Sequence, residues 1–301
     1  MSAQKQKIIS ACLLTAGCIG VYLTLRSLPV EACNFLHYGD YVNDAGIIEG
    51  CGYEEVGFFD LQTLRFPVTA SITTLEPPSK DHPGLFQIQL ETVSGTPIDY
   101  ENLVVSHTER LHAMIVDSSL QDYQHIHPRD GGQPGTYLFD FQPQSDGLYQ
   151  VFLDFIPLKT SRRTLITTQF QISEHHLNPL IHPTQLEFTD KDFSYTLIPS
   201  SETFTVGQSI PFSLQVKSLH HQTIQFGPVM DSFAHIVAFD PSLRGFAHFH
   251  PLNPLIENQD PSNPELDFLF SVDRPGYYRV WAQVSINGEE RFIPFDIQAT
   301  L

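Results

Sequence analysis

The chain is short of positive charge: its 301 residues include 16 Lys and Arg against 34 Asp and Glu, for a formal net charge of −18. A surface with this excess of negative charge repels phosphate backbones, so we expect no nucleic-acid partner. Enzyme motifs are lacking too. There is no Gly-x-Ser-x-Gly elbow, no Gly-x4-Gly-Lys phosphate loop, no His-Glu-x2-His and no Cys-x2-Cys-His haem site. We therefore expect a protein that is not an enzyme.

Cysteine is also rare, with four residues in the chain. Two of them lie in an uncharged N-terminal run, which leaves Cys33 and Cys51 as the pair in the rest of the sequence. We expect a disulfide between these two, because exposed thiols tend to oxidise in extracytoplasmic compartments. Two free thiols are the alternative.

The uncharged run covers residues 8–25 and follows Lys5 and Lys7. Its length is close to the roughly 20 residues that span a bilayer, and lysines on its N-terminal side place that end in the cytoplasm. Three outcomes are open: a retained membrane anchor, cleavage near Ala32, and lipidation at Cys18. All three place the folded part outside the cytoplasm, in the periplasm or at the cell surface.

What the sequence does contain is an internal repeat. Several residues reappear at a constant offset of 123 positions without a gap. The pairs are His112/His235, Asp117/Asp240, Leu120/Leu243, His125/His248, His127/His250 and Pro128/Pro251. Aromatic and glycine positions further along recur at an offset of 129. Agreement of this extent indicates a duplication.

Each copy has the pattern of an all-β domain. Segments such as 86–90 and 212–216 alternate with a period of two, as half-buried strands do, and Gly-containing turns separate them. Short strands over about 110 residues favour an immunoglobulin-like β-sandwich. The expected organisation is a membrane segment at 1–32, a Cys33–Cys51 segment at 33–60, a first sandwich at 61–173, a linker at 174–184 and a second sandwich at 185–301.

Three histidines of the first copy are expected to converge. Residues i and i+2 of a strand share a face, so His125 and His127 point the same way. Closing the hairpin between them and the preceding strand sets Met114 opposite His125 and His112 opposite His127. The three imidazoles and Met114 would then form one patch.

The second copy repeats the arrangement with His235, His248 and His250. Just upstream of the two cluster strands stand His107 and, at the matching position, Met230, and both side chains can bind copper. Three neutral imidazoles suit copper or zinc, so we expect each copy to bind one such ion.

A structural role is the alternative for these histidines. Val116, Val237 and Phe239 share the histidine face, which would place the rings in an interior. The ring nitrogens would then bond backbone carbonyls and stabilise the hairpins. A structural or adhesive tandem immunoglobulin-like protein is the function that this alternative implies.

The pattern His-x4-Asp-x2-Leu-x2-aromatic-x-His-x-His-Pro is followed by an aromatic strand and a Pro-Gly-x-Tyr or Asp-Gly-x-Tyr turn. This combination resembles tandem modules in bacterial exported proteins that are associated with heavy-metal or copper handling. It is also similar, more loosely, to the small immunoglobulin-like domains of the YtkA and FixH families and to periplasmic copper carriers. The resemblance covers residues 61–299 and implies an envelope protein that handles a transition metal. The Cys/His heavy-metal segment that some such proteins carry is absent from this sequence.

Overall fold

The computed structural model describes residues 3–27, 41–42, 48–49, 58–61, 66–80, 82–174, 177–230, 232–249, 252, 259–272 and 274–301. Cys33 and Cys51, for which a disulfide was expected, lie outside the described residues, as does His250. The chain divides into two compact units, Met1–Cys33 and Asn34–Leu301.

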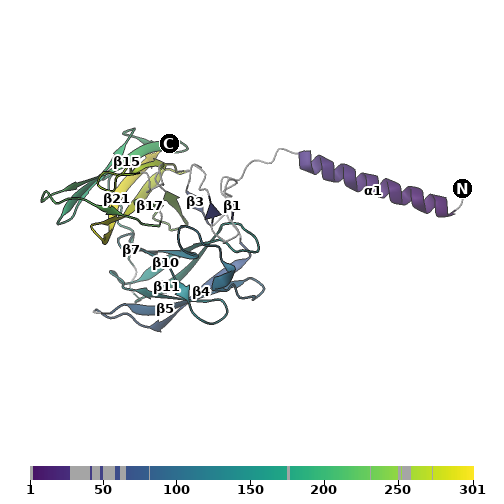
Figure 1. The fold of residues 1–301 in the computed structure, drawn as a ribbon, viewed down its shortest axis with the longest axis horizontal. Coiled ribbons are helices and arrows are strands. Elements are labelled where there is room, and N and C mark those ends of the chain that lie inside the picture. Colours follow the sequence, from purple (N-terminus) through teal and green to yellow (C-terminus); the bar gives the residue numbers. More distant parts are fainter. Residues whose placement is uncertain are drawn as a thin grey trace. The chain divides into compact units, whose positions relative to one another are not determined.

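The N-terminal unit contains the helix α1 (Ala3–Ser27), drawn in purple in Figure 1. The helix includes the uncharged run for which a membrane segment was expected. Among the described residues, however, no helix has the length and apolar character needed to cross a membrane. Cys18 lies on this helix as an exposed free cysteine.

The second unit is all-β, as expected, and begins with a short hairpin of β1 (Tyr41–Val42) and β2 (Ile48–Glu49). The first sandwich follows (Figure 1). One of its sheets has the order β4-β5-β9-β8 and the other β11-β10-β6-β7. The strands are β4 (Val68–Glu76), β5 (Gly84–Thr92), β6 (Leu111–Asp117), β7 (Tyr123–Ile126), β8 (Arg129–Asp130), β9 (Thr136–Phe141), β10 (Leu148–Phe155) and β11 (Thr164–Gln171), with the 3-10 turn η1 (Tyr100–Asn102) after β5. This strand order is that of an immunoglobulin-like sandwich.

The second sandwich has the same plan. One sheet has the order β12-β13-β15-β19 and the other β14-β21-β20-β17-β18-β3, with β16 paired to β20. The strands are β12 (Glu187–Thr189), β13 (Phe193–Pro199), β14 (Phe204–Thr205), β15 (Ile210–Ser218), β16 (Phe226–Gly227), β17 (Ala234–Phe239), β18 (Gly245–Phe249), β19 (Asp267–Phe270), β20 (Gly276–Ile286) and β21 (Glu289–Thr300). The strands that carry the repeated histidines, β6-β7 and β17-β18, occupy corresponding places in the two sandwiches.

The edge strand β3 (Phe59–Asp60) belongs to the sheet of the second sandwich, although it precedes the first in sequence. It pairs with β18, where Gly245 faces Asp60. A Cβ atom at Gly245 would lie 1.7 Å from the carbonyl oxygen of Phe59, so only glycine allows this approach.

The strands β6 and β17 are buried on both faces. Their inward residues, such as Ile115 and Ile236, belong to the cores of their own sandwiches. Their outward residues belong to a third apolar cluster that draws on both sandwiches. Its buried members are Met114, Val116, Leu120, Tyr123, Phe152, Leu165, Val237, Phe239, Phe246, Tyr277 and Trp281. The histidine-bearing faces of the two sandwiches therefore pack against each other.

Aromatic rings dominate this interface between the sandwiches. The ring centroids of Phe152 and Phe239 are 5.5 Å apart, and those of Phe152 and Phe246 are 5.3 Å apart. The ring centroids of Tyr123 and Trp281 are 5.8 Å apart. Burying large aromatic side chains contributes several kcal/mol to an interface, which is the reason that the two sandwiches dock as one body.

Candidate metal centre

The hairpin registers are those that the sequence predicted. Met114 of β6 pairs with His125 of β7, and Val237 of β17 pairs with His248 of β18. The loop of the first hairpin is held by Asp117, whose carboxylate accepts the backbone N–H groups of Gln121 at 2.8 Å and Asp122 at 2.9 Å. Asp117 thus has a structural role in the loop.

The first hairpin brings its three histidines together. The ligand atoms of His112, His125 and His127 all lie within 4.8 Å of one another. The ring centroids are 5.0 Å apart for His112 and His127, and for His125 and His127, and 5.5 Å apart for His112 and His125. His112 and His125 are buried and His127 is half-buried. Three imidazoles at this spacing can hold one ion.

Two of these rings have one buried nitrogen that forms no hydrogen bond with the described residues. Nε2 of His112 lies 2.9 Å from the Ser106 carbonyl and Nδ1 of His125 lies 3.2 Å from Oε1 of Gln283. Since both oxygens are acceptors, these nitrogens carry the protons and the other nitrogen of each ring keeps a lone pair. Those two atoms, Nδ1 of His112 and Nε2 of His125, are buried and have no hydrogen-bond partner among the described residues. Leaving a buried polar atom unsatisfied costs about 1–3 kcal/mol, and these two nitrogens have lone pairs that a ligand can use.

The histidines of the second hairpin lie beside the first set. Nδ1 of His235 is 3.1 Å from Nε2 of His248, and both residues are buried. The ring of His125 lies 6.0 Å from that of His248 and 6.5 Å from that of His235. The two predicted clusters therefore form one group at the interface. We call it the interface histidine cluster: His112, His125 and His127 from the first sandwich, and His235 and His248 from the second.

Two further side chains reach this cluster from the opposite sandwich. Sδ of Met230 lies 3.2 Å from Nε2 of His127, and the ring of His107 lies 6.3 Å from that of His235. The sequence marks both positions as possible ligands but gives no sign that they cross the interface. Met114 pairs with His125 in the sheet, is fully buried and belongs to the third apolar cluster.

Gln283 is a neighbour that sequence reasoning missed. It occupies the position of β20 that corresponds to Asp154 of β10, at the offset of 129 residues. Asp154 pairs with His112 in the sheet and Gln283 pairs with His235, yet the Gln283 amide turns to His125 across the interface. The repeat offset could have pointed to the position, but its cross-interface contact depends on how the sandwiches dock.

Burial favours the neutral form of four histidines of the cluster, namely His112, His125, His127 and His235. Burial and the neighbouring histidines together lower the pKa of His127 to about 3, and burial together with His112 lowers that of His235 to about 4. The pKa of His125 lies well below its ordinary value for the same two reasons. Burial also lowers the pKa of His112, although Asp154 opposes this shift. At neutral pH these rings are uncharged, which is the form that binds metal ions.

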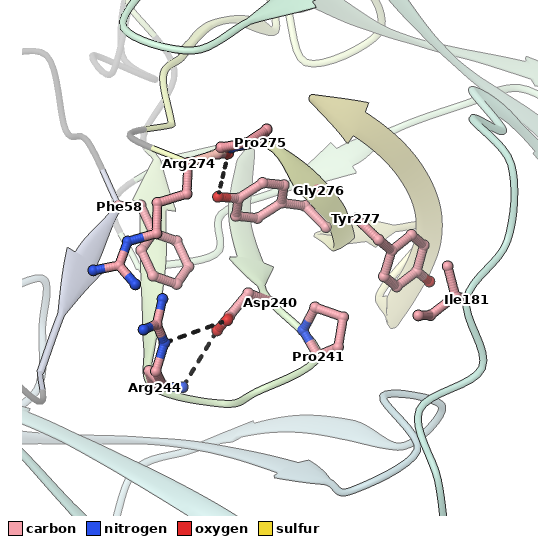
Figure 2. A pocket seen from close by; sticks show the side chains of 10 residues that line it. Phe58, Ile181, Asp240, Pro241, Arg244, Arg274, Pro275, Gly276 and Tyr277 are labelled. Atoms are coloured by element: carbon pink, nitrogen blue, oxygen red, sulfur yellow. Dashed lines mark hydrogen bonds and ion pairs between the residues drawn. The ribbon is translucent and has the colours of Figure 1, made fainter. Parts of the chain in front are cut away.

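Other polar groups of the second sandwich have structural roles. A pocket of about 210 Å³ next to β3 is lined by Asp240, Arg244 and Arg274 among others (Figure 2). Nη2 of Arg274 lies 2.6 Å from a carboxylate oxygen of Asp60, so these charges fasten the edge strand β3.

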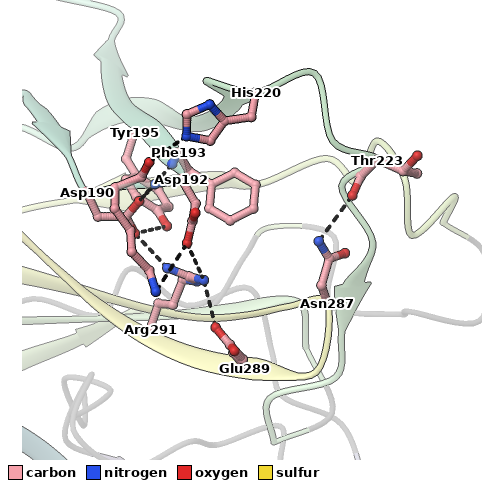
Figure 3. A network of polar contacts seen from close by, with 10 residues as sticks. Asp190, Asp192, Phe193, Tyr195, His220, Thr223, Asn287, Glu289 and Arg291 are labelled. Carbon is pink, nitrogen blue, oxygen red and sulfur yellow. Dashed lines mark hydrogen bonds and ion pairs between the residues drawn. The ribbon is translucent and has the colours of Figure 1, made fainter.

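A second network of ion pairs is drawn in Figure 3. The guanidinium nitrogens of Arg291 in β21 lie 2.7 Å from a carboxylate oxygen of Asp190 and 2.8 Å from one of Glu289. The network ties the turn before β13 to the last strand of the chain. His220 lies in the same region and bonds the Lys191 carbonyl at 2.9 Å, as a surface residue. Neither this network nor the pocket includes a member of the interface histidine cluster.

Comparisons with known proteins add little to this description. A family described only as a domain of unknown function, DUF8832, matches residues 189–300, which is the second sandwich. None of the curated proteins matches the chain in sequence.

Among solved structures, the Escherichia coli adhesin FdeC is 11% identical with a TM-score of 0.22, over 81% of this chain and 66% of that one. A putative membrane anchored protein from Corynebacterium diphtheriae is 9% identical with a TM-score of 0.23, over 76% and 57%. The chain thus spans less than two thirds of either protein. Likeness at this level carries no inference about function.

Proposed function

We propose that this protein binds a transition metal ion, copper or zinc, through His112, His125 and His127. One observation carries the proposal: three imidazole donors lie within 4.8 Å of one another, and two of them, in His112 and His125, have a buried nitrogen without a hydrogen-bond partner among the described residues. The opposite nitrogens of these rings donate to oxygen acceptors, as the outer nitrogen of a metal-bound histidine usually does. The function proposed for this site is binding, as a carrier, buffer or sensor.

The donor set favours copper and zinc. Neutral imidazoles suit zinc, copper and nickel, and among divalent ions the intrinsic affinity order places copper(II) highest. The corresponding histidines of the second sandwich, His235 and His248 with His250, are proposed as a second position for an ion. Because the two sets adjoin at the interface, binding at one position will affect the other.

A structural or adhesive role is the second candidate. Its support is that His112 bonds the Ser106 carbonyl and His235 lies 3.4 Å from the Met230 carbonyl, contacts that hold turns in place. Such contacts use one nitrogen of His112 and do not account for the other. The metal-binding proposal accounts for both.

We also propose that the protein acts outside the cytoplasm, in the periplasm or at the cell surface. The support is the uncharged N-terminal run preceded by lysines, together with the resemblance to exported modules. Nucleic acid is not among the proposed partners, given the net charge of −18.

The test is a titration of the full chain with copper(II) and zinc(II) by calorimetry. We expect His125→Ala to lower the affinity for both ions by at least about tenfold, since even residues that only support metal ligands contribute that much. The matched control is His82→Ala, which removes an exposed histidine far from the cluster in sequence. Equal affinity in the parent and in His125→Ala would leave the cluster with a structural role.

A further inference from the structure

We propose that the ion held by His112, His125 and His127 takes a fourth ligand from the second sandwich, the Sδ atom of Met230. This thioether would make the site selective for copper(I) over zinc. The inference rests on the proposed function, because it assigns a ligand and an ion to the same site.

The position of the sulfur fits shared coordination. Sδ of Met230 lies 3.2 Å from Nε2 of His127, and Met230 is 8% exposed. A nitrogen and a sulfur bound to one tetrahedral ion, at about 2.0 Å and 2.3 Å from it, lie roughly 3.5 Å apart. A thioether is a weak hydrogen-bond acceptor, so donation from an imidazole alone gives little reason for this contact.

The backbone of Met230 gives independent support. Met230 has φ of 49° in the turn between Val229 and Ser232, a left-handed conformation that costs a residue other than glycine about 1–2 kcal/mol. Glycine or asparagine would adopt it with less strain. The contact of the Met230 sulfur with His127 gives a reason for a methionine at this left-handed position.

The corresponding turn of the first sandwich also contains a residue with a left-handed backbone conformation. His107, the counterpart of Met230, also has φ of 49°, in a turn closed by hydrogen bonds between Ser106 and Glu109. Its ring lies 6.3 Å from that of His235. The ring of His107 also lies 6.3 Å from that of His112, so in each sandwich a left-handed residue of the corresponding turn places a potential metal-binding side chain at the interface histidine cluster.

Charge and ligand type both favour copper(I). Thioethers are soft ligands that select copper(I), whereas zinc sites use thiolate, imidazole and carboxylate. Three imidazoles and a thioether are all neutral, so a buried divalent ion would keep two uncompensated charges. Asp154, which pairs with His112 in the sheet, is already paired with Arg163, whose Nε lies 3.0 Å from both of its oxygens. Copper(I), which has a single charge, therefore has a smaller free-energy cost of burial than a divalent ion.

The test compares substitutions of two buried interface residues in the full chain, with thiols blocked by N-ethylmaleimide. Copper(I) affinity is measured by competition with bathocuproine disulfonate, and zinc affinity by competition with a chromophoric chelator. We expect Met230→Leu to lower copper(I) affinity by at least about tenfold and to leave zinc affinity unchanged. Tyr123→Phe, a conservative control in the same interface that removes no metal-binding atom of the proposed site, should change neither.

The outcomes separate the two proposals. If Met230→Leu has the same ratio of copper(I) affinity to zinc affinity as the parent, Met230 is not a ligand, while the proposal of a histidine site still stands. A parent that binds neither ion overturns the proposed function itself. X-ray absorption at the copper edge gives an answer without that variant: selenomethionine-labelled Met114→Leu protein loaded with copper(I) should show a selenium neighbour. A shell of nitrogen alone contradicts the proposal.

Discussion

Acid should destabilise the metal-free protein through its buried histidines, and His235 gives the magnitude. Its pKa is about 4 in the folded protein, against about 6.5 for an exposed histidine in the unfolded chain. Because the folded pKa is the lower one, the unfolded chain binds more protons between these two values. The free energy of unfolding therefore falls as the pH drops from about 6.5 towards 4.

The size of the effect follows from the shift. One pKa unit corresponds to about 1.4 kcal/mol, so at pH 5 the neutral His235 side chain destabilises the folded state by about 2 kcal/mol relative to pH 7. His235→Gln removes the titrating group and keeps a polar side chain. We expect the difference in unfolding free energy between pH 7 and pH 5 to be about 2 kcal/mol smaller in this variant.

Urea unfolding with a metal chelator present measures the effect. The chain has one tryptophan, Trp281, which is buried in the interface between the sandwiches. Its fluorescence therefore changes when the interface unfolds. The control is His82→Gln, an exposed histidine that should leave the pH dependence as in the parent. If His235→Gln loses as much stability on acidification as the parent does, the burial argument for the cluster is wrong.

Three further predictions concern the interface, the edge strand and the metal. Phe239→Ala, which removes a ring 5.5 Å from that of Phe152, should lower the unfolding free energy by about 3–5 kcal/mol in urea denaturation. Gly245→Ala should displace β3, because the new Cβ collides with the Phe59 carbonyl, and faster hydrogen exchange at 58–61 would show it. Copper at a thousandfold excess over its dissociation constant should raise the unfolding free energy by about 4 kcal/mol, and His125→Ala should reduce this increase to about 2.7 kcal/mol or less in thermal unfolding.

The sequence was sufficient to predict the hairpins that carry the histidines. Strand alternation and the gapless repeat set the register that pairs Met114 with His125, and the structure has this register. The repeat also predicted two sandwiches of the same plan. These are local features, determined by the period of a strand and the length of one loop.

The docking of the two sandwiches could not be predicted in the same way. Val116 and Phe239 on the histidine face supported an interior position only as the alternative, and no local rule says what covers this face. Met230 and His107 were recognised as possible ligands, while their approach to the other sandwich depends entirely on that docking. The strand β3 was missed because two residues are too few to show a period.

Anomalous diffraction at the copper edge, from crystals of the full chain grown with copper, tests the central claim most directly. The account predicts a peak enclosed by His112, His125 and His127 at the interface between the sandwiches, with Met230 beside it. A map without a peak among these three side chains, from crystals that contain copper, would contradict the account.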